Sequence, residues 1–207
     1  MRPAILLVDV DGVVVHPANP LGWSADIERD LGILGSTLQS RFFQVHWEDI
    51  IHGRAGLRER LSVVLAEIAP QVSCEQFIRY WFEGDAELDA RLLAQLAAVR
   101  ATGVTMHLAT VQEHERAAYL WNNLGLRDHF DDMHYAASLG ASKPSPAFYE
   151  AVEQRTGLRA SAIAFIDDSE RNVQAACERG WQAALWTSGA SLNALLPELA
   201  RPDSELR

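Results

Sequence analysis

The second half of the chain alternates between helix-like and strand-like segments, and few fold classes are compatible with that alternation. Apolar residues recur at helical spacing in residues 90–103, 113–125, 145–157, 169–180 and 191–200. Short runs typical of strands lie between them, at residues 104–110, 130–137, 162–168 and 181–187. Strands that alternate with helices form βαβ units, which build a mainly parallel sheet covered by helices. The alternation therefore predicts an α/β fold.

The first strand-like run stands apart from the others. Residues 4–8 are continuously aliphatic, as expected for a strand that is buried on both faces of a parallel sheet. The segment from there to residue 89 contains helical patterns, such as residues 56–69 and 74–84, and few strand candidates. This order predicts a sheet domain with a helical insertion directly after its first strand.

The composition argues against several classes of partner. The chain has 207 residues and a formal net charge of −10, whereas binding to nucleic acids or anionic membranes depends on Lys and Arg. A small anionic substrate stays compatible, because the local charge at a site can oppose the net charge. Cys74 and Cys177 lack the spacing of a disulfide framework or a zinc site. The apolar run before Asp9 is too short for a signal core or a membrane helix, so we expect a cytoplasmic protein.

Polar residues follow the predicted strands at the positions where ligands of such sheets bind. They are Asp9, Asp11, Thr110, Lys143, Asp167 and Asp168. Ligands of open parallel sheets bind at the carboxyl ends of the strands. Each residue also has an ordinary alternative, such as an Asp-Gly turn, a helix cap or a solvated lysine. Because they recur together at strand ends, or in a loop that can reach the same edge, we interpret them as one site.

As a set, these segments resemble the motifs of the haloacid dehalogenase-like hydrolase superfamily. The stretch DVDGV looks like the first motif, Thr110 like the second, Lys143 in SLGASKPSPAFYE like the third, and FIDDSERNV like the fourth. The helical block from Val13 looks like the small α-helical cap that one branch of the family inserts there. The resemblance implies a Rossmann-like three-layer α/β/α core over residues 1–14 and 89–207, with a helical cap domain over residues 15–88.

The resemblance also implies a Mg²⁺-dependent hydrolase of small phosphate monoesters that forms an aspartyl-phosphate. Asp9 would be the nucleophile and a metal ligand. Asp11 would act as an acid toward the leaving oxygen and later as a base toward the attacking water. A carboxylate that attacks an anionic phosphoryl group needs cations at close range, which Mg²⁺ and Lys143 would supply.

The remaining matched positions would complete the metal and phosphate contacts. Asp168, Asp167 and the backbone carbonyl of Asp11 would bind the metal, with Asp167 bound directly or through water. Thr110 and Lys143 would contact phosphoryl oxygens. Gly12 would let the backbone turn sharply and leave amides free to meet the phosphate, and the backbone amide at Val111 can also bind it.

Asp11 bears on the type of reaction. A halide leaving group needs no proton donor, whereas the alkoxide that leaves a phosphate ester does. Dehalogenases of the family usually lack this second aspartate, so we favour a phosphatase. A phosphosugar mutase, a 2-haloacid dehalogenase and a non-catalytic binding protein that retains the fold are the alternatives. The family often has Asn directly after the second-motif residue, whereas Val111 and Gln112 follow here, so substrate choice cannot be carried over from relatives.

The cap is expected to contact the part of the substrate beyond the phosphate. His16, where the chain leaves the first strand, and Arg54 in the cap are candidate substrate contacts. His46, Trp47 and His52 are further candidates, although surface or core roles are more usual for such residues. The expected partner is a small phosphorylated metabolite, with sugar phosphates as one candidate class. The natural substrate and the oligomeric state are not predicted.

Overall fold

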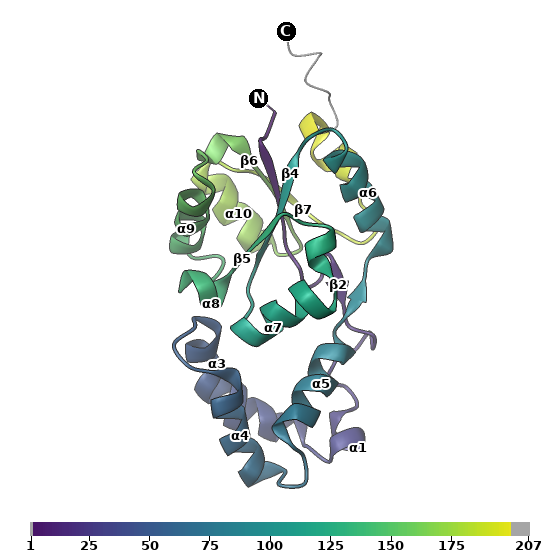
Figure 1. Ribbon diagram of the computed structural model, residues 1–207, viewed down its shortest axis with the longest axis vertical. Coiled ribbons are helices and arrows are strands. Elements are labelled where there is room, and N and C mark those ends of the chain that lie inside the picture. The colour runs from purple at the N-terminus through teal and green to yellow at the C-terminus, as the bar shows by residue number, and fades with distance from the viewer. Residues whose placement is uncertain (1, 200–207) are drawn as a thin grey trace.

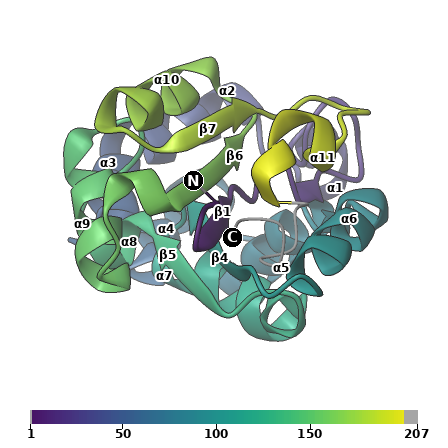
Figure 2. The same cartoon turned by 90° about the horizontal axis from the view of Figure 1, so that it is seen from above.

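The computed structural model describes residues 2–199 and confirms the predicted parallel sheet. Within these residues, its strands are β1 (Ile5–Val8), β4 (Thr105–Thr110), β5 (Asp132–Tyr135), β6 (Ile163–Asp167) and β7 (Gln182–Leu185). Figure 1 shows the sheet with its helices, and Figure 2 shows the strand order β5-β4-β1-β6-β7; each neighbouring pair is parallel. β1 is therefore central. The segments that follow β1, β4 and β6 meet at the carboxyl ends of the strands.

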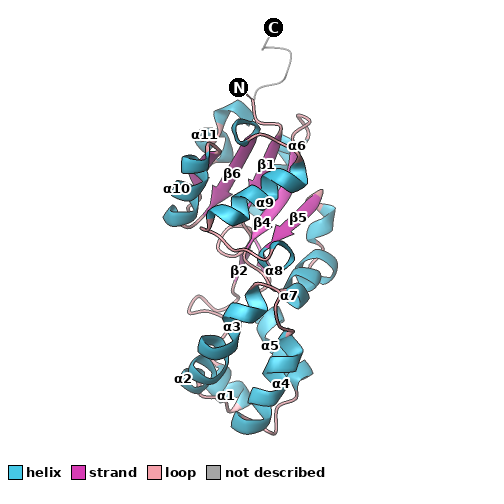
Figure 3. Cartoon of the chain, turned by 90° about the vertical axis from the view of Figure 1, so that its left-hand side faces the viewer, coloured by secondary structure: helices cyan, strands magenta, loops and turns pink. Residues whose placement is uncertain are grey.

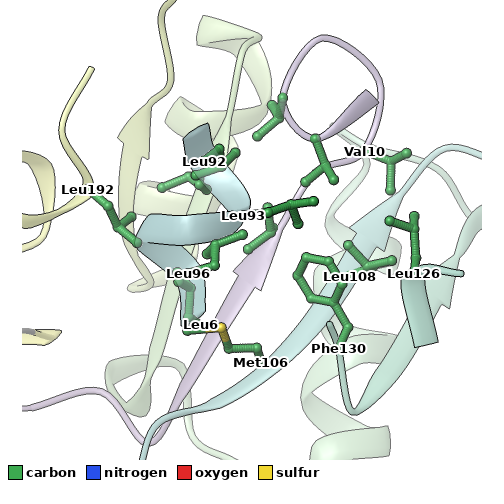
Figure 4. Close-up of a cluster of buried hydrophobic side chains, with 14 of the residues drawn as sticks. Leu6, Val10, Leu92, Leu93, Leu96, Met106, Leu108, Leu126, Phe130 and Leu192 are labelled. Atoms are coloured by element: carbon green, nitrogen blue, oxygen red, sulfur yellow. The ribbon is translucent and has the colours of Figure 1, made fainter. Parts of the chain in front are cut away.

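Helices cover both faces of the sheet (Figure 2). They are α6 (Ala90–Arg100), α7 (His114–Ala118), α8 (Ala136–Leu139), α9 (Pro146–Thr156), α10 (Glu170–Arg179) and α11 (Leu192–Leu195). Successive residues of β1 point to opposite faces. Leu6 and Val8 join the apolar cluster with α6 and α11 that Figure 4 shows in part, whereas Ile5 and Leu7 pack with α9 and α10. The predicted three-layer α/β/α arrangement is confirmed.

The helix boundaries lie close to the predicted ones, with local exceptions. Gly157 (φ 68°) and Gly180 (φ 97°) end α9 and α10 in the left-handed conformation that glycine adopts most readily. The predicted helix at 113–125 divides into α7 and the π-helical η2 (Tyr119–Asn123). Short 3₁₀ turns are η3 (Leu126–Asp128), η4 (Ala160–Ala162) and η5 (Pro197–Leu199). The predicted helix at 191–200 corresponds to α11 and η5, and its last residue lies outside the described residues.

The longest of the described helices is α4 (Leu57–Ile68), which has 12 residues. Among the described helices, none is long and apolar enough to cross a bilayer. The cytoplasmic location stays a prediction.

The segment between β1 and α6 is helical, as predicted. It contains α1 (Ile27–Leu31), α2 (Gly35–Leu38), the π-helical η1 (Gln39–Phe43), α3 (Gln44–Ile51), α4 (Leu57–Ile68) and α5 (Cys74–Gly84). These helices lie beyond one end of the sheet and pack around their own apolar cluster (Figure 3). The rings of Trp23 and Trp47 lie 5.1 and 5.6 Å from the ring of Trp81. Trp47 is thus part of the aromatic packing of this region.

A two-stranded ribbon, which the sequence did not predict, joins the helical region to the sheet. β2 (Val15–His16) pairs with β3 (Glu87–Leu88) in antiparallel orientation. Two residues per strand are too few to produce a periodic pattern. The ribbon lies where the sequence placed both boundaries of the insertion. We retain the division into a core (1–14 and 89–207) and a cap (15–88) as a proposal.

Candidate active site

Lys143 lies between the acids that follow two neighbouring strands. β1 and β6 pair with Val8 opposite Ile166, so Asp9 and Asp167 come side by side. Nζ of Lys143 is 2.8 Å from Oδ1 of Asp9 and 2.6 Å from Oδ2 of Asp167. All three residues are buried. Burial lowers the pKa of Lys143, but Asp9 and Asp167 together outweigh it and raise this pKa above its usual value, so the lysine stays charged.

The carboxylate of Asp167 is held by further donors. Oδ1 accepts hydrogen bonds from the backbone N–H of Ser169 (2.8 Å) and from Nδ2 of Asn172 (3.0 Å). The Asn172 amide also lies 3.0 Å from Oδ2. Ser169 and Asn172 therefore hold the Asp167 carboxylate in place beside Lys143. Asn172 was not predicted as a site residue, although its place in the first turn of the helix after the acid pair was a usable signal.

Asp168 lies against the loop that follows β1. Gly12 has φ +76°, and a Cβ atom at this residue would lie 2.1 Å from Oδ2 of Asp168, so glycine is needed for two reasons. The N–H of Gly12 donates to the carbonyl of Val15 at 2.9 Å. The turn itself therefore uses the Gly12 N–H, and a phosphate contact at this loop stays a prediction.

Three carboxylates form a cluster that suits a hard cation. One oxygen each of Asp9, Asp167 and Asp168 lies within 4.8 Å of the other two. Burial raises the pKa of Asp9, and Asp167 raises it further, while Lys143 opposes both. Burial and Asp167 likewise raise the pKa of Asp168. The single positive charge of Lys143 does not balance the negative charge of three carboxylates. Because Mg²⁺ binds carboxylate oxygens, these donors fit a Mg²⁺ ion.

Asp11 is oriented by Gln112, which stands in the sequence only as a departure from the family pattern. Nε2 of Gln112 donates to Oδ2 of Asp11 at 2.6 Å and lies 3.5 Å from Oγ1 of Thr110. Burial raises the pKa of Asp11 to about 6, against the opposing charge of Arg116. Thr110 is buried at the end of β4, and Val111 beside it is half-buried. The structure thus brings Asp11 and Thr110 together through Gln112.

Arg116 connects this site to the helical region. Its guanidinium donates to the carbonyl of Phe82 at 2.8 Å and to the carbonyl of Asp85, and it lies 5.2 Å from the centre of the Phe82 ring. Arg116 is 2% exposed, and its charge lowers the pKa of Asp11. No sequence pattern pointed to this role, because an arginine in a polar helical stretch is usually solvated.

The loop between α3 and α4 contacts the core next to Lys143. Nε2 of His52 lies 3.2 Å from Oγ of Ser142. A Cβ atom at Gly53 would lie 2.4 Å from the carbonyl oxygen of Ala137. This loop therefore reaches the core beside the segment that carries the site lysine.

The other predicted substrate contacts divide between the site and the cap. His16 lies near the acids: its Nε2 is 3.9 Å from Oδ2 of Asp89, and its charge lowers the pKa of Asp168. Arg54 instead donates to Oδ1 of Asp49 at 2.8 Å. His46 packs against the Phe42 ring, with 6.1 Å between ring centres. His16 therefore contacts Asp89 and acts on Asp168 through its charge, whereas Arg54 and His46 contact neighbours within the cap.

Comparisons with known proteins bear on the family and the fold of this chain. The sequence model of the haloacid dehalogenase-like hydrolase family matches residues 4–178. A phosphoglycolate phosphatase of Pectobacterium atrosepticum is 26% identical over 204 residues, which cover 96% of this chain and 86% of that protein. A haloacid dehalogenase family enzyme of Bacteroides thetaiotaomicron, solved as a magnesium complex, superposes with a TM-score of 0.78 at 18% identity, covering 94% of this chain and 98% of that one. A predicted hydrolase of this type from Porphyromonas gingivalis gives a TM-score of 0.76 at 16% identity, covering 98% of this chain and 100% of that one.

Proposed function

Because the chain belongs to the haloacid dehalogenase-like hydrolase family, we propose that it is a Mg²⁺-dependent phosphatase of small phosphate monoesters. The observation that carries the proposal is the buried Asp9–Lys143–Asp167 arrangement at the carboxyl ends of β1 and β6. An attacking carboxylate beside a fixed ammonium is what transfer of an anionic phosphoryl group requires.

Asp9 is the proposed nucleophile. Its Oδ1 accepts from the N–H of Val10 at 2.7 Å and contacts Lys143, so Oδ2 is the oxygen that can attack phosphorus. Attack forms an O–P bond on Asp9 and breaks the bond between phosphorus and the leaving oxygen. Lys143 offsets negative charge on the transferred group, and Thr110 is placed to donate a hydrogen bond to it. When bound, Mg²⁺ would be held by Asp9, Asp168, the Asp11 carbonyl and Asp167, directly or through water, and would neutralise phosphoryl charge.

Asp11 is the proposed proton carrier. In its protonated form it gives a proton to the departing alkoxide, and as a carboxylate it then takes a proton from the water that cleaves the aspartyl-phosphate. The second step returns Asp9 and releases inorganic phosphate. Gln112 keeps the Asp11 carboxyl in one orientation through both steps. This proton transfer favours a phosphate ester over the carbon–halogen bond of the dehalogenase alternative.

We further propose that the substrate is a small phosphorylated metabolite with an alkyl leaving group. The phosphoglycolate phosphatase relative supports phosphoglycolate as the first compound to test, and sugar phosphates follow. The cap, residues 15–88, is the proposed specificity region. His16 is its proposed contact nearest to the acids, and the amide of Val111 stays a candidate phosphate donor.

The test is phosphate release from a panel of phosphorylated metabolites with Mg²⁺, and with EDTA in its place. We expect Asp9→Asn to lower kcat by about 10³-fold or more, as removal of a nucleophile does. The exposed Asp128 gives the matched control, Asp128→Asn, which should keep wild-type activity. Full activity of Asp9→Asn contradicts the assignment. Isomerised product in place of free phosphate would instead identify the mutase alternative.

A further inference from the structure

A second group of side chains that could bind a metal lies on β4 and the outermost strand β5, away from the residues assigned above. His107 lies on β4, and Asp132 and His134 lie on the edge strand β5. The register pairs His107 with Asp132 and Ala109 with His134. Because alternate residues of a strand share a face, all three side chains belong to the face on which Ala109 packs with α9. One nitrogen or oxygen atom of each lies within 4.8 Å of the other two.

The two imidazoles face one another in a buried setting. Nδ1 of His107 and Nε2 of His134 are 3.0 Å apart. His134 is 1% exposed, and its Nδ1 is buried without a hydrogen-bond partner among the described residues. A buried polar nitrogen without a partner costs free energy. The facing nitrogens, Nδ1 of His107 and Nε2 of His134, rather than the unpartnered Nδ1 of His134, are therefore the pair positioned to share one ion.

The neighbouring charged groups leave this cluster accessible to a cation. Arg155, the cation whose charge acts on His134, donates to the carbonyl and to Oγ of Ser138 at 2.7 and 3.0 Å. Among the described residues, Oδ1 of Asp132 accepts a hydrogen bond only from the neighbouring N–H of Met133, at 2.7 Å, which leaves Oδ2 for another ligand. Asp132 is exposed and His107 half-exposed, so an ion can reach the cluster from solvent.

We propose that His107, Asp132 and His134 bind one divalent transition-metal ion of the Zn²⁺ class. Two imidazole nitrogens and one carboxylate oxygen are typical ligands of such ions, whereas Mg²⁺ takes oxygen ligands. Two nitrogens bound to tetrahedral Zn²⁺ at about 2.0–2.1 Å lie roughly 3.3 Å apart, so the observed pair needs to open by only a few tenths of an ångström. A water molecule completes four-coordination. The site is independent of the proposed phosphatase activity.

Such an ion would join β5 to β4. β5 pairs with β4 alone, because it is the edge strand of the sheet. A ligand from β4 and two from β5 make the ion a cross-link between them. Binding therefore stabilises the folded state over the unfolded chain.

The test titrates Co²⁺, as a spectroscopic substitute for Zn²⁺, into the full chain saturated with Mg²⁺. We expect one equivalent of Co²⁺ to give the visible absorption of a four-coordinate ion. His107→Gln and Asp132→Asn, both at accessible positions, should each weaken this binding at least tenfold. The control His129→Gln alters an exposed histidine outside the cluster and should bind like the wild type.

Two outcomes overturn the proposal. The first is equal Co²⁺ binding by the wild type and His107→Gln. The second is loss of the absorption in Asp168→Asn, because it would place the ion in the acid cluster of the active site. In support, Zn²⁺ added to the Mg²⁺-saturated protein should raise the Tm of the wild type and of His129→Gln, but not that of His107→Gln.

Discussion

The hydrogen bond from Gln112 to Asp11 gives a single-residue test of the proton-transfer role. Its length is 2.6 Å, and the side chain of Gln112 is buried. A hydrogen bond to a charged group contributes about 1.5–3 kcal/mol, so Gln112→Leu should lower kcat for an alkyl phosphate roughly 10- to 100-fold. An aryl phosphate with a good leaving group depends less on an acid, and its kcat should fall less. The measurement is kcat for phosphoglycolate and for para-nitrophenyl phosphate with each enzyme.

The surface residue Gln174 supplies the control for that comparison. Its amide bonds to Glu178 on the same helix, so Gln174→Leu should leave both rates unchanged. Equal losses of kcat for the alkyl and aryl substrates in Gln112→Leu would show that Gln112 supports the fold of the site rather than proton transfer.

At single positions, the sequence was informative where a residue follows a strand. Asp9, Thr110 and Asp167 end or follow parallel strands. A parallel sheet brings such positions together at the carboxyl ends of its strands, whatever the conformations of the side chains. Gln112 and Arg116 could not be assigned in the same way. Their contacts depend on how far a long side chain reaches across the structure, and no local pattern encodes that reach.

The loop between α3 and α4 tests whether docking of the cap matters for turnover. Gly53 has φ +71°, and an added Cβ atom would clash with the carbonyl of Ala137. Gly53→Ala should therefore displace the loop from the core beside Lys143. A displacement of about 1 Å can cost roughly 100-fold in rate, and we expect kcat/KM for an alkyl phosphate to fall about 10- to 100-fold.

The control Gly22→Ala separates the effect of this clash from the effect of backbone strain. Gly22 also has a positive φ, +99°, but nothing lies within 4 Å of its Cβ position. Alanine in the left-handed region costs roughly 1–2 kcal/mol at either glycine, so both variants should lose stability in urea unfolding, and Gly53→Ala should lose more because of its clash. Only Gly53→Ala should lose activity. If Gly22→Ala loses as much kcat/KM, the contact with Ala137 has no role in turnover.

Whole elements were predictable where a pattern persisted over several residues. The helices and strands after residue 89 have enough periodicity to be placed, and the helical insertion was recognisable by its lack of strand candidates. The β2–β3 ribbon has two residues per strand, and its pairing joins positions 71 or more residues apart in the chain. Such contacts are set by the fold around them, so a local pattern does not contain them.

Over the whole molecule, we expect the cluster of Asp9, Asp167 and Asp168 to oppose folding until a cation binds. Asp9, Asp167 and Asp168 lie close together in a chain whose formal net charge is −10. Burial and Asp167 raise the pKa of Asp168, which means that the folded state disfavours its ionised form at neutral pH. Removing that charge should stabilise the metal-free protein, and the same change should weaken Mg²⁺ binding.

We therefore expect the effect of Asp168→Asn on the free energy of unfolding to change sign when Mg²⁺ is added. In EDTA, the variant should unfold at an equal or higher urea concentration than the wild type, because the repulsion from Asp167 is gone. At Mg²⁺ concentrations near 100 times its dissociation constant, the wild type should gain about 2.7 kcal/mol in free energy of unfolding. The variant, having lost one carboxylate ligand, should gain much less, while Asp128→Asn should follow the wild type under both conditions. If Mg²⁺ stabilises Asp168→Asn as much as the wild type, Asp168 does not bind the ion, and the acids of this edge must be reassigned.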